Sequence, residues 1–196
     1  MVFGFVNQTE DGQRYNSAAV MKDGQILGIY NKQNLPNYSV FDEKRYFSEG
    51  HQHLVFEYLG HKFGVLICED VWSLPTVQQL ARLNVETALV LNASPYEVGK
   101  PQHRVATMSE LAKQLNINLV YTNQVGGQDD LIFDGTSFVV NNSGTVATQA
   151  ATFKCRKAFL RRGGKLRLRP EPQRQGSCSR QKGQSHLRHG KKRSLL

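Results

Sequence analysis

The sequence lacks any apolar run long enough to cross a membrane. A membrane-spanning helix needs about 20 consecutive, mostly apolar residues, and no such run occurs among the 196 residues. The opening residues 1–16 contain no basic segment and no small-residue cleavage site, so no secretory signal is predicted. The sequence therefore predicts a soluble protein without a membrane partner.

Cysteine is also scarce. The three cysteines, Cys68, Cys155 and Cys178, have neither the paired spacing of a zinc site nor the density of a disulfide framework. The sequence therefore predicts no metal site, and it favours a reducing, cytoplasmic location.

Acidic residues are almost absent from the last 43 residues. Residues 154–196 contain 15 lysines and arginines against one acid, whereas residues 1–153 contain 10 against 15. The net charge of +9 therefore comes entirely from the C-terminal part. Basic tails can bind nucleic acid, but this one lacks the interleaved aromatic residues that stack on bases. A nucleic-acid partner is therefore only weakly indicated.

Residues 154–196 are interpreted as a basic, disordered tail or as the product of a shifted reading frame. The segment has no consistent hydrophobic period and little to bury, which favours disorder. The alternative rests on arginine codons of the CGN type, which read one base later encode Val, Ala, Asp, Glu or Gly. With permissible codon choices, residues 158–170 then become an apolar strand and an acidic turn, which resumes the pattern of the preceding residues.

Residues 1–153 predict an α/β domain in which hairpins come first and helices follow. Asp23-Gly24 is a strong hairpin signal, and Gly60-His61 is interpreted as a second turn. The predicted strands are 2–6, 16–22, 25–31, 53–59, 62–68, 86–94 and 117–123, followed by short strands to about residue 150; the predicted helices are 76–83 and 101–116. This order predicts a mixed sheet covered by helices on one face.

The sharpest local feature is the segment GVLICEDVW, residues 64–72. An apolar strand ends at Cys68, and two acids and a tryptophan follow at once. A nucleophile at the C-terminal end of a strand is held by the sheet and presented at a turn, as in the nucleophile elbow of serine hydrolases. A lone cysteine on an apolar strand is more often a buried structural residue, but the adjacent Glu69 and Asp70 argue against a purely apolar setting.

Three further segments carry candidate functional residues. Lys32 leaves a strand and enters a long polar stretch, residues 33–50, of the kind that is often functional. A later strand ends near Ser94, with Lys100 beyond it. Adjacent glycines in residues 123–135 permit close backbone approach to a ligand or another segment.

Together these four segments resemble the carbon–nitrogen hydrolase (nitrilase) superfamily. The generic match is Lys-x-x-Leu at residues 32–35 and the strand-end cysteine in ICED. The blocks LPNYSVFDEKRYF, ICEDVW and NQVGGQDDLIFDG, in that order, resemble more narrowly the glutaminase domain of glutamine-dependent NAD synthetase. The resemblance covers residues 1 to about 153.

The resemblance implies an α-β-β-α sandwich and a glutamate–lysine–cysteine triad that hydrolyses the side-chain amide of L-glutamine. Cys68 would be the nucleophile, Lys32 would stabilise the oxyanion, and Glu43 would orient the lysine and the substrate. An ammonium beside the thiol is expected to lower its pKa toward neutrality. The residues that fall where the family lines its glutamine pocket are Tyr38, Glu69, Trp72, Ser94 and Lys100.

One triad member has no counterpart in the sequence. The family's general base is a glutamate well before the lysine, and the only glutamate before Lys32 is Glu10, in the turn-like segment TEDGQ. The domain is therefore expected to be N-terminally truncated. The resemblance implies no cofactor for this domain; ATP and deamido-NAD are expected only in a synthetase domain, normally part of the same chain, and the intact protein is expected to be a homo-oligomer.

Two other functions stay open. A free-standing amidase or nitrilase with another substrate would share the cysteine and the lysine, although the VFDEKRYF and VGGQDD blocks argue against it. A catalytically dead fragment is the other alternative, because a cysteine without a partner to accept its proton would turn over poorly.

Overall fold

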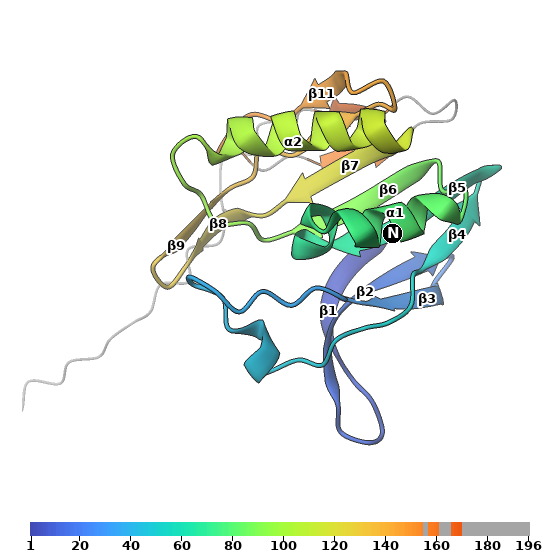
Figure 1. The fold of residues 1–196 in the computed structure, drawn as a ribbon, viewed down its shortest axis with the longest axis vertical. Helices are drawn as coiled ribbons and strands as arrows, with labels where there is room; N and C mark the ends of the chain where they lie inside the picture. The colour runs from blue at the N-terminus through green and yellow to red at the C-terminus, as the bar shows by residue number, and fades with distance from the viewer. Residues whose placement is uncertain (155–156, 161–165, 170–196) are drawn as a thin grey trace, which may run out of the picture.

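The computed structural model describes residues 1–154, 157–160 and 166–169 (Figure 1). Its centre is a mixed six-stranded sheet in which β5, β6 and β7 run parallel and the outer strands run antiparallel. In spatial order the strands are β11 (Val146–Gln149), β10 (Phe138–Val140), β7 (Asn118–Asn123), β6 (Thr87–Asn92), β5 (His61–Ile67) and β4 (Val55–Tyr58). The mixed sheet predicted from the sequence is confirmed.

A second, antiparallel sheet contains β1 (Val2–Gln8), β2 (Arg14–Lys22) and β3 (Gln25–Asn31). Asp23 and Gly24, which join β2 to β3, both have positive φ, the conformation that a two-residue turn between twisted strands requires. The β4–β5 turn is built in the same way by Leu59 and Gly60, so its predicted position is wrong by one residue.

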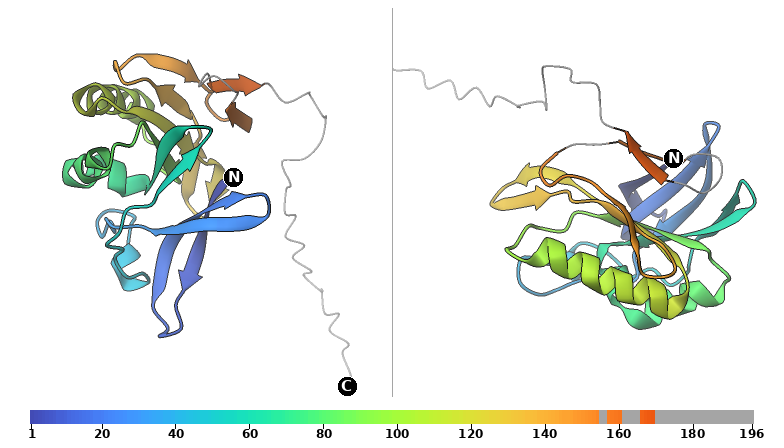
Figure 2. Two further views of the ribbon diagram at one scale, coloured as in Figure 1. Left: turned by 90° about the vertical axis from the view of Figure 1, so that its right-hand side faces the viewer. Right: turned by 90° about the horizontal axis from the view of Figure 1, so that it is seen from above.

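The helices α1 (Leu74–Arg82) and α2 (Lys100–Leu115) lie side by side on one face of the six-stranded sheet (Figure 1). The three-stranded sheet packs against the other face, as Figure 2 shows from the side. This arrangement explains why residues 63–67 of β5 form an unbroken buried run, since a strand covered on both faces has no polar side.

Three of the four layers of the expected α-β-β-α sandwich are present in the described part of the chain. A helical layer over the outer face of the three-stranded sheet has no counterpart among these residues. On that face Ile26 and Ile29, which pair with Met21 and Ala19, are 57% and 42% exposed.

Two short strands lie in the segment after residue 153. The strands β12 (Lys157–Leu160) and β13 (Leu166–Arg169) pair antiparallel, with Leu160 opposite Leu166 and Ala158 opposite Leu168. The reason is the period-two alternation of leucine and arginine in residues 166–169, a strand pattern that the high charge obscured. The rest of the expected tail, residues 155–156, 161–165 and 170–196, lies outside the described residues.

Adjacent glycines in the 123–135 segment form a strand. Gly126 and Gly127 lie in β8 (Val125–Gln128), which pairs with β9 (Leu131–Asp134) in a hairpin. Its turn contains Asp129, which has a positive φ. Within the described residues, neither helix is both long and apolar enough to cross a membrane.

Candidate active site

The candidate nucleophile lies where β5 ends. Directly after Ile67 the chain enters a 3₁₀ helix, Cys68–Trp72, and Cys68 has a φ of 44°. A non-glycine residue in this left-handed region costs about 1–3 kcal/mol and is typical of functional turns. The backbone therefore turns sharply at Cys68, in the manner of the nucleophile elbow that the sequence suggested.

Lys32 and Glu43 form a close ion pair. The Nζ of Lys32 donates to both carboxylate oxygens of Glu43 at 2.7 Å. The lysine side chain is 1% exposed and the glutamate 20%. A buried ammonium is stable only when it is paired and hydrogen-bonded, so Glu43 supplies the partner that Lys32 needs and fixes its position. The structure thus brings together two of the three residues predicted to be catalytic.

The loop after β3 is closed by backbone contacts at Lys32. Its N–H donates to the carbonyl of Asn16, and its carbonyl accepts from Gly50 at the end of the loop, both at 2.8 Å. Residue 50 must be glycine, because a Cβ there would collide with the carbonyl group of Asn31. Backbone hydrogen bonds at Lys32 and Gly50 thus hold both ends of the long polar loop, residues 33–50, beside the candidate site.

The electrostatic surroundings of Cys68 contradict one sequence prediction. Burial raises the pKa of the Cys68 thiol to about 11, and Lys32, although it lowers the pKa, does not compensate for burial. Carboxylates around the thiol raise the pKa further, in the order Glu69, Glu43 and Asp70. The expected shift toward neutrality is therefore wrong, because the prediction considered the ammonium alone, whereas burial and the carboxylates of Glu69, Glu43 and Asp70 outweigh it.

Alkylation of Cys68 is expected to accelerate throughout the range from pH 7 to pH 10. Because only the thiolate reacts and the pKa is about 11, the rate constant should rise roughly tenfold per pH unit without levelling off. Iodoacetamide labelling read on the Cys68 peptide by mass spectrometry would measure this. The urea-unfolded chain is the control and should level off near the ordinary thiol pKa of about 8.5. A plateau below pH 9 in the folded chain would contradict the prediction.

A cleft of about 340 Å³ adjoins the cysteine turn. It is lined by three of the predicted pocket residues, Tyr38, Glu69 and Trp72, together with the loop from Gln33 to Asn37. The hydroxyl of Tyr38 donates to Glu69 at 2.9 Å. Burial and this carboxylate raise the pKa of Tyr38 to about 12, so the phenol keeps its proton for hydrogen bonding. The described cleft is polar and of a size to hold an amino acid.

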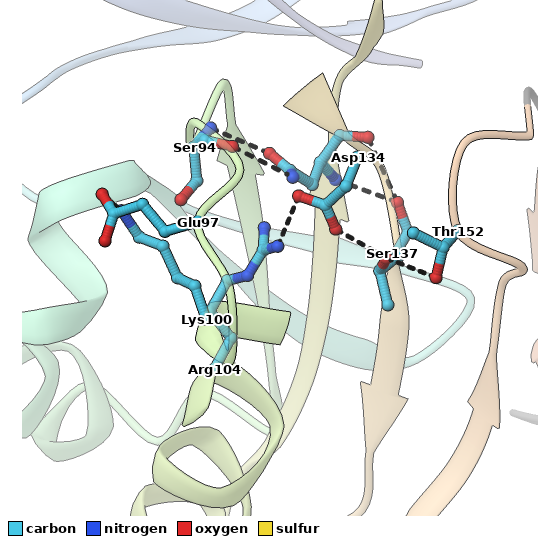
Figure 3. A network of polar contacts seen from close by, with 9 residues as sticks. Ser94, Glu97, Lys100, Arg104, Asp134, Ser137 and Thr152 are labelled. Carbon is cyan, nitrogen blue, oxygen red and sulfur yellow. Dashed lines mark hydrogen bonds and ion pairs between the residues drawn. The ribbon is translucent and has the colours of Figure 1, made fainter. Parts of the chain in front are cut away.

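The other two predicted pocket residues come from neighbouring elements. Ser94 follows β6, is 5% exposed, and its backbone N–H donates to the side chain of Asn123 at 2.9 Å. Lys100 begins α2 and pairs with Glu97 at 2.9 Å (Figure 3). It lies one turn before His103, whose ring stacks on the cleft residue Trp72. Ser94 and Lys100 are not among the residues that line the cleft.

Two buried carboxylates near the site were not singled out by sequence reasoning. Asp70 is fully buried and accepts five hydrogen bonds. Asp134 is also fully buried; it pairs with Arg104 of α2 at 2.5 Å and accepts from Thr136 (Figure 3). The signal in the sequence was an aspartate at the end of an apolar strand, for Asp134, or just beyond one, for Asp70. A buried aspartate is rare unless its carboxylate is paired.

Glu10 is exposed in the turn between β1 and β2, where the sequence placed it. The neighbouring Thr9 and Asp11 form a side-chain hydrogen bond within that turn. Among the described residues, the only glutamate ahead of Lys32 therefore belongs to a hairpin turn.

Comparison with known sequences identifies the relatives. The carbon–nitrogen hydrolase family matches residues 1–155. The glutamine-dependent NAD(+) synthetase of Acinetobacter baylyi is 80% identical over 154 residues, which cover 79% of this chain and 28% of that protein. The corresponding protein of Thermotoga maritima is 46% identical over 158 residues, with 79% and 27% covered. The chain thus spans less than a third of the length of these relatives.

Comparison with solved structures finds relatives of the same family. Glutamine-dependent NAD+ synthetase from Acinetobacter baumannii, in complex with ADP, aligns with a TM-score of 0.78 and 74% identity over 86% of this chain and 30% of that one. A variant of the amidase from Nesterenkonia sp. AN1, with an acetamide moiety added covalently at its active-site cysteine, aligns with a TM-score of 0.68 and 27% identity over 76% and 56%. These alignments confirm the mixed α/β, nitrilase-like fold.

Proposed function

We propose that this chain, which belongs to the carbon–nitrogen hydrolase family, hydrolyses the side-chain amide of glutamine with Cys68 as the nucleophile. The observation that carries the proposal is the pairing of a buried Lys32 with Glu43 beside a cysteine held in a strained strand-end turn. A thiol and a fixed ammonium are the two groups that acyl transfer from an amide requires.

The chemistry follows from these groups. The Cys68 thiolate attacks the amide carbon, and the electron pair of the C=O double bond moves onto oxygen to give a tetrahedral oxyanion. The Lys32 ammonium stabilises this charge, and one such donor contributes about 3–4 kcal/mol. The intermediate then collapses: the C=O bond re-forms, the nitrogen takes up a proton, and the C–N bond breaks. Ammonia is released, and a γ-glutamyl thioester remains on Cys68. Water then hydrolyses the thioester to glutamate and the free thiol.

Proton transfer is the demanding part of this cycle. A thiol pKa of about 11 means that Cys68 is protonated at neutral pH, so attack requires a base. The nearby carboxylates are already engaged: Glu43 by Lys32, Glu69 by Tyr38, and Asp70 by five donors. The resemblance assigns this task to a glutamate ahead of the lysine, and Glu10 does not occupy such a position.

The substrate assignment rests on similarity together with the cleft. The relatives at 80% and 46% identity are glutamine-dependent NAD(+) synthetases. In the proposal, the cleft lined by Tyr38, Glu69 and Trp72 holds the glutamine. The resemblance also assigns Ser94 and Lys100 to this pocket, although neither lines the cleft. In the proposal, ammonia passes to a synthetase domain that consumes ATP and deamido-NAD. The amidase alignment supports the alternative of simple amide hydrolysis, at lower identity.

A competition experiment separates glutamine from other amides. The chain is treated with 6-diazo-5-oxo-L-norleucine, a glutamine analogue that alkylates nucleophiles, and labelling of Cys68 is followed by mass spectrometry. We expect glutamine to protect Cys68 at concentrations at which asparagine and butyramide do not. Equal protection by butyramide would favour a general amidase. Labelling by iodoacetamide but not by the analogue would contradict glutamine binding.

A further inference from the structure

Asp70 lies at the junction of the two segments that carry Lys32 and Cys68. Its Oδ1 accepts from the backbone N–H groups of Gln33 and Asn34 at 3.1 and 2.8 Å, and from the Asn34 side chain at 3.1 Å. Its Oδ2 accepts from the Tyr30 hydroxyl at 2.8 Å and from the N–H of Ile67 at 3.0 Å. One fully buried carboxylate thus receives donors from both sides of Lys32 and from the residue before Cys68.

The hydrogen bonds to Asp70 connect the segment that carries Lys32 with the segment that carries Cys68. The backbone bonds of Lys32 to Asn16 and Gly50 hold it to its own sheet and loop. Among the hydrogen bonds of the described residues, every one that joins residues 30–34 to residues 67–70 ends on the Asp70 carboxylate. Asn34 also donates to Thr76 at 2.8 Å, which extends the network to α1.

We propose that Asp70 is a positioning residue that sets the distance between the Lys32 ammonium and the Cys68 sulfur across the two sheets. The inference rests on the proposed roles of Lys32 and Cys68. Asp70 touches neither substrate nor sulfur; it acts by fixing the backbone on each side of both residues. A carboxylate suits this task because it accepts several hydrogen bonds at once and makes charge-assisted ones, which are stronger than neutral bonds.

The rival explanation is that Asp70 serves stability alone, as many fully hydrogen-bonded buried carboxylates do. The two explanations differ in their effect on the thiol. Several groups influence Cys68 or are influenced by it: Lys32, Glu43, Glu69, Asp70, Tyr38 and Tyr121. Asp70 by its charge raises the thiol pKa, whereas Lys32 lowers it by more. Loss of the Asp70 charge therefore lowers the pKa of the Cys68 thiol, whereas displacement of the Lys32 ammonium raises it.

The test is a double-mutant cycle with Asp70→Asn and Lys32→Met. The rate of Cys68 alkylation by iodoacetamide is measured between pH 7 and pH 9, peptide by peptide, without any need for glutamine turnover. In the chain with Lys32, Asp70→Asn should slow alkylation about threefold per unit rise in pKa, because the loss of thiolate is partly offset by its greater nucleophilicity. In the Lys32→Met background the same change should accelerate alkylation, because only a negative charge is lost.

Acceleration by the same factor in both backgrounds would overturn the proposal, since Asp70 would then act through its charge alone. Asp134→Asn is the matched control, because Asp134 is equally buried and pairs with Arg104; it should change the alkylation rate less than twofold. Failure of the glutamine analogue to label Cys68 would count against the proposed substrate but would leave this cycle interpretable.

A second variant covers the case in which Asp70→Asn does not fold. Tyr30→Phe combined with Asn34→Ala removes two side-chain donors on the Lys32 segment and leaves the Asp70 charge in place. Alkylation should slow in the chain with Lys32 and stay unchanged with Lys32→Met. An unchanged rate in both backgrounds, with circular dichroism showing a folded chain, would contradict the positioning role.

Discussion

In a chain whose triad is complete, with a glutamate base ahead of the lysine, replacing Cys68 by alanine is expected to lower the rate of glutamine hydrolysis by about 10⁴-fold or more. Residues that act as one catalytic unit show losses of this order when the nucleophile is removed, because no other group can form the acyl intermediate. The expectation follows from the position of Cys68 at the end of β5, beside Lys32 and the cleft. Ammonia and glutamate release, measured together, would give the rate.

The sequence offers a control for this substitution. Cys155 and Cys178 lie outside the described residues, and replacing both by serine should leave hydrolysis unchanged. A Cys68→Ala chain that kept more than a tenth of the original rate would remove Cys68 from its proposed role. Equal losses in the Cys155→Ser/Cys178→Ser chain would assign the reactive thiol to the C-terminal segment instead.

Local patterns predicted the elements of this fold well. Asp23-Gly24 marked its hairpin because both residues of such a turn need positive φ, a requirement that is visible in the residue types themselves. The apolar run before Cys68 marked the strand that the structure shows as β5. The boundaries were less certain: α1 begins at Leu74 and not at residue 76, because Pro75 fits the first turn of a helix.

Properties that depend on long-range burial were not predictable in the same way. The thiol pKa depends on how deeply Cys68 is covered and on the carboxylates that surround it, and no local pattern reports their distances. Asp70 carried a signal only in its place after Cys68, while its five donors come from residues up to 40 positions away. Spacing in the sequence thus indicated the Lys32 and Cys68 segments but not the group that joins them.

Removing one partner of the buried pair between Arg104 and Asp134 is expected to lower the free energy of unfolding by about 3–5 kcal/mol. Both side chains are at most 1% exposed, so Asp134→Ala would leave a guanidinium charge buried without its partner. The loss should be larger still because Nη1 of Arg104 already has no hydrogen-bond partner within the described structure. Urea denaturation followed by circular dichroism would measure the change.

The double variant Arg104→Met/Asp134→Leu distinguishes the two possible sources of this loss. If the cost comes from an uncompensated charge, replacing both residues by apolar ones should recover most of the stability, since the desolvation of two ions is then avoided. If the stability comes instead from the direct bond that the pair makes between α2 and the β8–β9 hairpin, the double variant should be at least as unstable as Asp134→Ala. We expect recovery, because the backbone bond from Tyr96 to Ile132, at 2.7 Å, holds the hairpin independently of the pair.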